Sequence, residues 1–413
     1  MEDFKQGYKQ TDIGVIPEDW EVRSLGSIIT KTQLGGNYPN HGIQNDTPLI
    51  KMGNLNRGYI NIEKIQYIKS TSKSSEQDKL YFGDLLFNTR NTLDLVGKVA
   101  IWRNELNNAY FNSNIMRIKF NEKYISTNFF MNLVLNTKQT VEQLRGIAIG
   151  TTSVAAIYNR DLFTLQIVLP TKKEQTAIAT ALSDTDALIA ALDKKIAKKQ
   201  QIKQGAMQQL LTGKKRLPGF SGENKYKETE IGLIPEDWEV KTISEVASVT
   251  TGNKNTQDKS DEGVYPFFVR SQNIERIDTY SFDGEGVLTA GDGVGTGKVF
   301  HYINGKFDFH QRVYLIYNFD SSLSGKYFFC FFKRYFSDRI SQLTAKSSVD
   351  SVRREMISEM PILLPTISEQ TAIAQILTDM DNEIAQLEKE RDKYKELKAG
   401  MMQVLLTGRI RLI

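Results

Sequence analysis

Polar side chains that can hydrogen-bond to nucleobases gather in two stretches of this 413-residue chain, at places where turns are expected. Arg, Asn and Gln can make the paired hydrogen bonds that distinguish guanine and adenine in the major groove of DNA, and Ser, Thr and Lys suit phosphate oxygens. The candidates in the first stretch are Asn54, Asn56, Arg57, Thr89, Arg90, Asn91, Lys98, Arg145, Thr151, Thr152 and Ser153. The candidates in the second stretch are Arg270, Gln272, Asn273, Lys298, His310, Gln311, Arg312, Lys346, Ser347 and Ser348.

Any one of these clusters could be an ordinary polar turn. Their recurrence at matched places in two stretches favours a DNA-binding surface in each. The net charge of +4 is mild, but residues 194–216 hold eight Lys or Arg and no acid, which is compatible with contact to a polyanion or with a solvated helix face.

A glycine-rich run from Gly291 to Lys298 partly matches a phosphate-binding loop. The full pattern GxxxxGK[ST] is not met, because Asp292 stands in place of the first glycine and Val299 in place of the hydroxyl residue. The following residues are strand-like, so no helix N-terminus would face a phosphate. We interpret the run as a glycine-rich hairpin or a DNA-facing loop.

Catalytic patterns are missing from the sequence. There is no tetrapeptide beginning Asn-Pro-Pro or Asp-Pro-Pro of the kind that amino-methyltransferases use. His41, His301 and His310 are scattered without cysteine partners, and the single cysteine, Cys330, lies in an apolar run. We therefore expect a non-enzymatic DNA-recognition protein without a cofactor or metal site, which provides sequence recognition for other subunits.

The chain is internally duplicated, and the duplicated segments must position these polar clusters. Residues 8–22 and 226–240 differ at three of 15 positions, and EQTAIA occurs at residues 174–179 and again at 369–374. The first pair is offset by 218 residues and the second by 195, so the first variable block is longer by 218 − 195 = 23 residues. This arrangement predicts a constant frame that carries two different reading heads. Within the heads we match Gly83-Asp84 to Gly291-Asp292, and Gly97-Lys98 to Gly297-Lys298.

Each repeat ends in a long predicted helix. Thr171 with Glu174, and Thr366 with Glu369, have the spacing of a capping box, and Gly213 and Gly408 suit the left-handed position after a helix. Apolar residues recur at heptad spacing, for example Ile373, Leu377, Met380, Ile384 and Leu387 in the second helix. We expect the two helices, each roughly 60 Å long, to pair antiparallel and to bring the C-terminus close to the first IPEDW segment. The alternative is that each helix packs only on its own globular domain.

Some apolar helix positions lie outside the predicted seam and are candidates for a subunit interface. They are Ile202, Met207, Leu211, Leu397, Met402 and Leu406. Gly205 and Gly400 occupy the same position in the two helices, which suggests close approach of another helix or a local bend, or plain tolerance.

The predicted fold class is α+β, with two globular α/β domains separated by two long antiparallel helices and related by a pseudo-two-fold axis. The expected boundaries are residues 1–170 for the first domain, 171–213 for the first helix, 214–230 for a linker, 231–365 for the second domain and 366–413 for the second helix and tail. The absence of a long apolar run and of a disulfide framework predicts a cytoplasmic protein without membrane spans.

The duplicated layout, the EQTAIA helix starts, the LLTGKKRLPGF exit and the IGxIPEDWEV segments resemble the specificity subunit of type I restriction–modification systems. The resemblance covers essentially the whole chain. It implies two target-recognition domains that each read one half of a split DNA sequence. Because the two variable blocks differ, we expect that target to be asymmetric. It also implies two adenine-methyltransferase (modification) subunits docked on the helices, and ATP-dependent translocase and nuclease (restriction) subunits that join them.

Two other functions remain possible from the residues alone. The first is a fragment of a single-chain restriction and methylation enzyme, against which the missing catalytic motifs argue. The second is a coiled-coil adaptor that has no DNA role.

Overall fold

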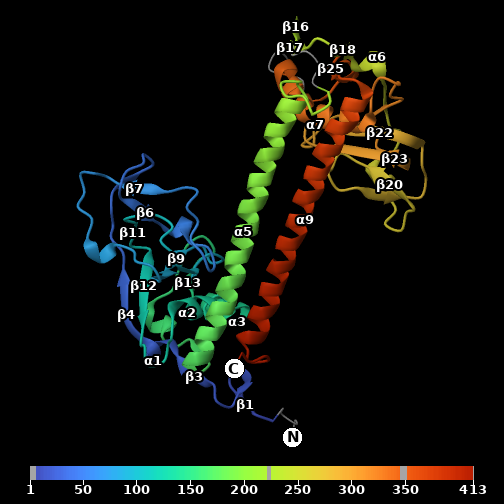
Figure 1. Cartoon of the computed structure of the whole chain (residues 1–413). Coiled ribbons are helices and arrows are strands. Elements are labelled where there is room, and N and C mark those ends of the chain that lie inside the picture. Colours follow the sequence, from blue (N-terminus) through green and yellow to red (C-terminus); the bar gives the residue numbers. More distant parts are fainter. Residues whose placement is uncertain (1–5, 221–224, 345–350, 413) are drawn as a thin grey trace. The chain divides into compact units, whose positions relative to one another are not determined.

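The computed structural model of the protein describes residues 6–220, 225–344 and 351–412. The chain forms two compact units. Unit 1 comprises residues 1–192 and 390–413, and unit 2 comprises residues 193–389. The division passes through both long helices, α5 (Lys172–Leu210) and α9 (Ile367–Leu405), so that each unit contains one piece of each helix (Figure 1).

Unit 1 opens with a hairpin and continues into two four-stranded sheets, ordered β10-β8-β12-β4 and β11-β6-β7-β5. A three-stranded sheet, β13-β14-β9, adds to one end, and β15 pairs with β3. The strands are β1 (Tyr8–Thr11), β2 (Gly14–Pro17), β3 (Glu21–Ser24), β4 (Ile29–Leu34), β5 (Asn40–His41), β6 (Pro48–Ile50), β7 (Gln66–Ile68), β8 (Leu85–Asn88), β9 (Arg90–Asn91), β10 (Val99–Ile101), β11 (Tyr110–Phe111), β12 (Ile115–Phe120), β13 (Ile149–Gly150), β14 (Ala155–Ala156) and β15 (Gln166–Leu169). The short helices are α1 (Leu25–Ile28), η1 (Met52–Asn54), η2 (Glu76–Asp78), α2 (Asn128–Val134), α3 (Lys138–Gly146) and α4 (Asn159–Leu162).

Unit 2 repeats this plan with one six-stranded sheet, ordered β19-β24-β22-β23-β20-β21, because the long strand β23 serves both halves of the sheet. A hairpin again precedes it, and β18 pairs with β25. The strands are β16 (Tyr226–Thr229), β17 (Gly232–Pro235), β18 (Glu239–Thr242), β19 (Ser248–Thr251), β20 (Tyr265–Phe268), β21 (Glu275–Ile277), β22 (Phe282–Ala290), β23 (Phe300–Phe309), β24 (Val313–Tyr317) and β25 (Pro361–Leu364). The helices are α6 (Ile243–Val246), η3 (Thr256–Asp258), α7 (Gly325–Thr344) and α8 (Arg354–Ser358).

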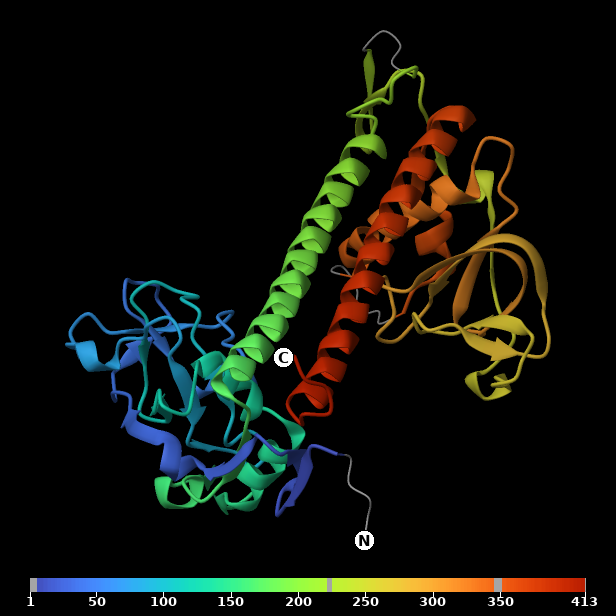
Figure 2. The same ribbon diagram turned by 60° about the horizontal axis from the view of Figure 1, so that its bottom comes forward.

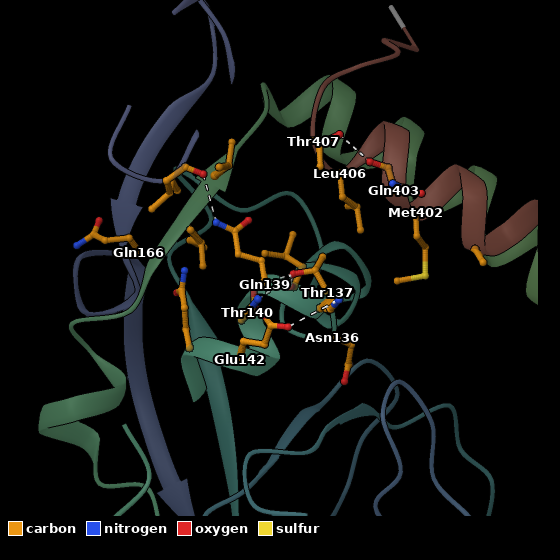
Figure 3. Close-up of a pocket in the computed structure, with 17 residues that line it drawn as sticks. Asn136, Thr137, Gln139, Thr140, Glu142, Gln166, Met402, Gln403, Leu406 and Thr407 are labelled. Carbon is orange, nitrogen blue, oxygen red and sulfur yellow. Dashed lines mark hydrogen bonds and ion pairs between the residues drawn. The ribbon is translucent and has the colours of Figure 1, made fainter. Parts of the chain in front are cut away.

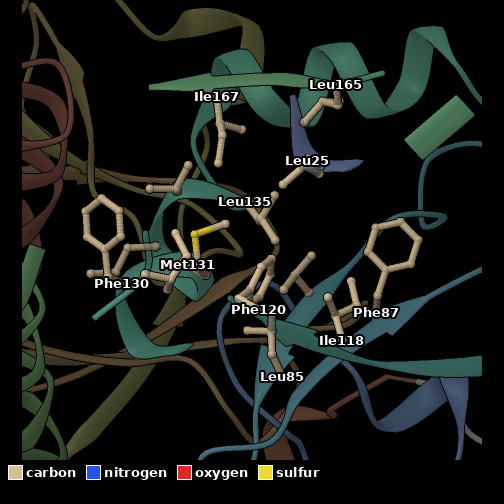
Figure 4. Packing of buried hydrophobic residues seen from close by; sticks show 14 of the residues in the cluster. Leu25, Leu85, Phe87, Ile118, Phe120, Phe130, Met131, Leu135, Leu165 and Ile167 are labelled. Atoms are coloured by element: carbon tan, nitrogen blue, oxygen red, sulfur yellow. The ribbon is translucent and has the colours of Figure 1, made fainter. Parts of the chain in front are cut away.

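The long helices contribute directly to the hydrophobic cores. In unit 1, Ile178 and Leu182 of α5 and Leu405 of α9 join the cluster that Figure 4 shows around Phe130 and Leu135. In unit 2, the matching positions of the other ends, such as Leu210 and Leu377, join the second large core. Of the predicted seam positions in α9, Met380 is partly buried and the other four are buried. Ile373 and Leu377 belong to the core of unit 2, so the seam also packs on the globular part.

Within each unit the two helix pieces run antiparallel, as predicted. In unit 1, Lys398 of α9 donates to Asp186 of α5 at 2.5 Å, while the C-terminal Arg411 reaches back to Glu174. In unit 2, Lys199 pairs with Glu383 at 2.7 Å and Lys203 pairs with Asp381. In both units, a higher residue number in α5 pairs with a lower residue number in α9. The two helices are therefore antiparallel in both units.

One polar cluster closes unit 1, and we call it the frame clamp: Asp19, Trp20, Glu174 and Arg411. The Glu174 side chain is fully buried, and it accepts from the indole Nε1 of Trp20 at 2.9 Å and from Arg411 Nε at 2.6 Å. Arg411 also makes two bonds, of 2.9 and 2.8 Å, to the carboxylate of Asp19. The C-terminus therefore lies against the opening hairpin, as predicted (Figure 1, Figure 2).

Unit 2 contains the same clamp, formed by Asp237, Trp238, Glu369 and Arg216. Trp238 Nε1 donates to Glu369 at 3.2 Å, and Arg216 bonds to Glu369 at 2.6 Å and to Asp237 at 2.9 Å. Hydrogen bonding from the arginine lowers the pKa of Asp237, as Arg411 lowers that of Asp19. Because the folded-state pKa is depressed, this contribution to stability is complete above the ordinary aspartate value and is lost as pH falls through the depressed value.

The clamp corrects the predicted capping boxes. Thr171 does accept from Glu174 N at 3.4 Å, and Thr366 from Glu369 N at 3.4 Å. The Glu174 and Glu369 carboxylates, however, bind tryptophan and arginine instead of a helix amide. Because these carboxylates are buried, leaving either one without a cation would cost more free energy than leaving the helix N-terminus uncapped.

The two glycines after the helices behave as predicted. Gly213 and Gly408 have φ of 68° and 70°, in the left-handed region. A Cβ on Gly408 would lie 2.5 Å from Pro17, and a Cβ on Gly213 would lie 2.5 Å from Pro235. Glycine is needed here for both its conformation and its small size.

One predicted landmark match is wrong. Gly83-Asp84 precede β8, whereas Gly291-Asp292 follow β22, the strand that takes the place of β8 in unit 2. The two Gly-Asp pairs therefore lie in turns that are not equivalent. Gly97-Lys98 directly precede β10, and Gly297-Lys298 precede β23 with Val299 between them; the two glycines share a left-handed φ, 72° and 68°.

We expect Arg411→Met to lower the free energy of unfolding of unit 1 by about 2–4 kcal/mol, because it leaves the buried Glu174 carboxylate without its cation. Urea unfolding followed by tryptophan fluorescence measures this change. Arg409→Met, at an exposed position in the same turn, is the control and should leave the midpoint unchanged. Equal midpoints for the two variants would contradict a stabilising role for the clamp.

Candidate nucleic-acid interface

The candidate surfaces lie at the same edge of the sheet in the two units. In unit 1, Thr89 follows β8 and donates its backbone N–H to Asn114 O at 3.1 Å. In unit 2, Gly291 follows β22 and donates to Arg312 O at 2.8 Å. The two edges are thus equivalent by hydrogen-bond register.

A later segment of the chain closes each edge in the same way. Ile157 N donates to Thr89 O at 3.0 Å, and Val352 N donates to Gly291 O at 2.7 Å. These donors are offset by 352 − 157 = 195 residues, the offset seen in the sequence. Residue 156 pairs with Arg90 in unit 1, and Ser351 bridges to Asp292 in unit 2.

The equivalent edge positions carry different side chains. Arg90 in unit 1 takes the position of Asp292 in unit 2, and Asn114 takes the position of Arg312. The two edges therefore share a backbone arrangement but present different hydrogen-bonding side chains.

The edge of unit 1 borders a cavity of about 730 Å³. Its walls include the predicted residues Thr89 and Arg90. The remaining lining residues are Thr32, Leu34, Ser113, Asn114, Met116, Ala156, Ile157, Tyr158 and Asn159. Leu34 and Tyr158 are about half exposed there, so the cavity offers apolar as well as polar contacts.

Three predicted cations gather beside this edge, and we call them the cation cluster: Arg57, Lys98 and Arg145. Arg57 Nη1 donates to Gly97 O at 3.3 Å, and Lys98 Nζ donates to Asn56 Oδ1 at 3.4 Å. Burial, and then the charge of Arg145, lowers the pKa of Arg57, while burial and the charge of Arg57 lower the pKa of Lys98. Arg145 is already paired with Asp94 at 2.5 Å, whereas Arg57 and Lys98 donate to the neutral oxygens named above and are suited to bind an anion such as a phosphate.

In unit 2 the structure brings Arg270, His310 and Arg312 together around Asp292. Gln311 Nε2 donates to Asn255 Oδ1 at 2.5 Å nearby. Gln272, Asn273 and Lys298 are exposed. Sequence reasoning missed Asp292 as part of a site, although it stood in the conspicuous glycine-rich run.

Two predicted contacts serve the protein interior. Asn54 is buried, accepts from Lys51 N at 2.9 Å and donates to Asn61 O and Lys64 O, so it organises its own loop. His310 is also buried, and its Nδ1 accepts from Arg312 N at 3.0 Å. We therefore leave both out of the proposed contact set.

The other predicted residues are spread along exposed turns. Thr151 and Ser153 hydrogen-bond to each other at 3.2 Å, with Thr152 between them, in the exposed connection from β13 to β14. Asn91 accepts from Thr92 N at 2.9 Å beside Arg90. Lys346, Ser347 and Ser348 lie outside the described residues.

A second cavity of about 730 Å³ lies in unit 1 between α3 and the end of α9. Figure 3 shows Met402 on α9 and Leu406 directly after it, with Thr137 and Gln139 across the space. Leu211, the equivalent of Leu406 in unit 2, is fully buried in the second core. Its predicted place on an exposed interface is therefore wrong.

Comparison with known proteins identifies the family. The model of the type I restriction modification DNA specificity domain matches residues 17–204 and again residues 235–399. The chain belongs to this family. As a type I specificity protein, it is a DNA-recognition component and not an enzyme.

Similar proteins have the same extent. The putative type I restriction enzyme MjaX specificity subunit of Methanocaldococcus jannaschii is 26% identical and aligns over 98% of this chain and 97% of its own. The MjaVIII specificity subunit of the same organism is 25% identical over 96% and 94%. The crystal structure of the S subunit from M. genitalium has a TM-score of 0.66 at 14% identity and covers 94% of this chain and 96% of its own, which confirms the fold.

Two classes of feature are missing from the part of the chain that the structure describes. No group of His, Cys, Asp or Glu there could hold a metal ion. No helix there is long and apolar enough to cross a membrane.

We expect Lys98→Met to weaken DNA binding by the protein with its partner subunits, because the cation cluster loses a phosphate contact. The slope of log K against log salt should become shallower by about 0.9. Fluorescence anisotropy across a salt series measures this slope. Lys173→Met, at an exposed position in the first turn of α5, is the matched control. An unchanged slope in Lys98→Met would show that the cluster does not touch phosphate.

Proposed function

We propose that the protein reads a bipartite, asymmetric DNA target, with one half-site for each unit. The observation that carries this proposal is the pair of equivalent sheet edges with different residues, Arg90 and Asn114 against Asp292 and Arg312. Equivalent backbones would approach DNA in the same manner, while different side chains would select different bases.

The way each variable block is held supports independent reading. Gln175 accepts from Ser126 N and donates to Tyr124 O, and Gln370 accepts from Ser324 N and donates to Ser322 O. These contacts reach only backbone atoms of the block. Because the frame hydrogen-bonds to main-chain atoms, it can hold variable blocks of different sequence.

We further propose that the two long helices dock two adenine-methyltransferase subunits, which restriction subunits then join. Ile202 and its equivalent Leu397 are each about half exposed, and Met207 and Met402 are partly buried. Gly205 and Gly400 are exposed, and a Cβ built on either would meet no atom of the described residues within 4 Å. Packing against the described residues therefore does not explain the two helix glycines, which is consistent with approach by a partner. We place this assembly in the cytoplasm, where its DNA lies.

Each variable block begins and ends at an equivalent backbone hydrogen bond, so one block can be replaced by a copy of the other. Leu25 N donates to Leu165 O at 2.9 Å, and Ile243 N donates to Met360 O at 3.0 Å. Replacing residues 25–165 by a second copy of residues 243–360 should yield a target with two identical half-sites. Sequencing of methylated adenines in cells that also hold the partner methyltransferase reads this result.

The reciprocal exchange, with residues 25–165 in both places, is the control and should give two copies of the other half-site. A chimera that retained both original half-sites, or changed both, would contradict reading by separate blocks.

Glutamine at both helix glycines tests the docks. We expect Gly205→Gln with Gly400→Gln to reduce the number of bound methyltransferases from two, because a long side chain would obstruct the partner. Alanine at the same positions is the control, and it should stabilise the free chain by about 1 kcal/mol per site. The mass of the complex in solution measures the stoichiometry. Two methyltransferases bound at unchanged affinity to the glutamine variant would exclude a dock at these positions.

A further inference from the structure

Three side chains from separate elements of unit 2 form a charged group that we call the arginine fork: Arg270, Asp292 and Arg312. Asp292 Oδ1 accepts from Arg270 Nη1 at 2.7 Å, and Asp292 Oδ2 accepts from Arg312 Nη1. The arginine side chains are 41% and 60% exposed, whereas the carboxylate is 17% exposed. One largely covered acid thus holds two exposed cations side by side.

The backbone under the fork is fixed on every side. Gly291 N donates to Arg312 O at 2.8 Å, and Arg312 N donates to the buried His310 ring at 3.0 Å. Burial lowers the pKa of His310, which keeps the ring neutral and its Nδ1 able to accept. His310 N in turn donates to Phe268 O at 2.9 Å, in the strand that leads to Arg270.

The fork also accounts for the glycine-rich run. A Cβ on Gly295 would lie 2.5 Å from Arg270 O, and Gly293 has a φ of 74°. The loop from Gly291 can therefore pass over Arg270 and deliver Asp292 between the two arginines only with glycine at these positions. A phosphate-loop role is not needed to explain them.

Unit 1 has no counterpart of the fork at the equivalent described positions. Arg90 replaces Asp292 and Asn114 replaces Arg312. Met52 replaces Arg270, since Ile50 pairs with Phe111 as Phe268 pairs with Phe309. The fork is thus a feature of one recognition unit, and it cannot be part of the shared frame.

In its side-chain bonds to described residues each guanidinium uses Nη1, and its Nε and Nη2 edge bonds to none of them. That edge has the spacing to donate to O6 and N7 of guanine. We propose that Arg270 and Arg312 read guanine in the half-site of unit 2, and that Asp292 is the positioning residue that orients them. This inference rests on the proposed bipartite recognition and specifies the base class for one half.

The experiment compares wild type with Asp292→Asn, Asp292→Glu and Arg312→Lys, each assembled with the partner methyltransferase. Methylation mapping first defines the two half-sites, and competition binding then measures the cost of each base-pair change. We expect a G·C pair in the half-site of unit 2 whose replacement weakens wild-type binding about 10-fold or more. Asp292→Asn and Arg312→Lys should remove most of that discrimination and leave the other half-site unchanged, and Asp292→Glu should restore part of it.

Asp261→Asn, which removes the same charge at an exposed position of unit 2, is the matched control and should keep full discrimination. Uniformly weaker binding to all sequences with a shallower salt slope would mean phosphate contact and overturn the inference. A half-site of unit 2 without a G·C pair would also overturn it. If Asp292→Asn fails to fold, Arg312→Lys decides, because it keeps the charge but loses the planar fork. Failure to find any split target would instead refute the proposed function.

Discussion

The buried carboxylates Glu174 and Glu369 are the interaction on which the rest of this structure depends. Each is removed from water, so each must be neutralised by a cation and satisfied by hydrogen bonds. Trp20 or Trp238 supplies one bond, and Arg411 or Arg216 supplies the charge. The arginine comes from the end of the helix that begins in the other repeat, so the carboxylate joins three distant segments at one point.

The neighbouring glutamines complete a division of labour in each helix start. The glutamate binds side chains of the constant segments, and Gln175 or Gln370 binds the backbone of the variable block. The two side chains are fully or almost fully buried. The glutamate needs particular side chains in the constant segments, so the sequence of the frame is repeated closely. The glutamine needs only backbone atoms of the variable block, so the sequences of the two blocks can differ.

Much of the fold could be predicted from the sequence, because repeats and apolar periodicity are local signals. The long helices, their antiparallel direction, the glycine after each helix and most strands that flank the sites follow from such patterns. The role of Glu174 did not, since a capping pattern spans four residues while its true partners lie 154 and 237 residues away. The Gly-Asp pairs were mismatched because identical letters can occupy different turns, and only strand register distinguishes them. In the candidate site, residue type is enough to predict Arg57 and Lys98. It does not predict Asp292, because an acid bonds neither to phosphate nor, by the types considered, to a base, and its role depends on the two arginines beside it.

The interrupted course of unit 1 has a consequence for how the protein is made. Unit 2 is one continuous segment, residues 193–389, whereas unit 1 needs residues 390–413 to be complete. A ribosome synthesises the chain from the N-terminus, so residues 1–192 cannot bind Arg411 until all of unit 2 has been synthesised. The residues of unit 2 are all synthesised before Leu405 and Arg411, which complete the core and the clamp of unit 1. N-terminal domains usually fold first during synthesis, but in this protein the N-terminal unit receives its last residues after the unit that follows it in the sequence.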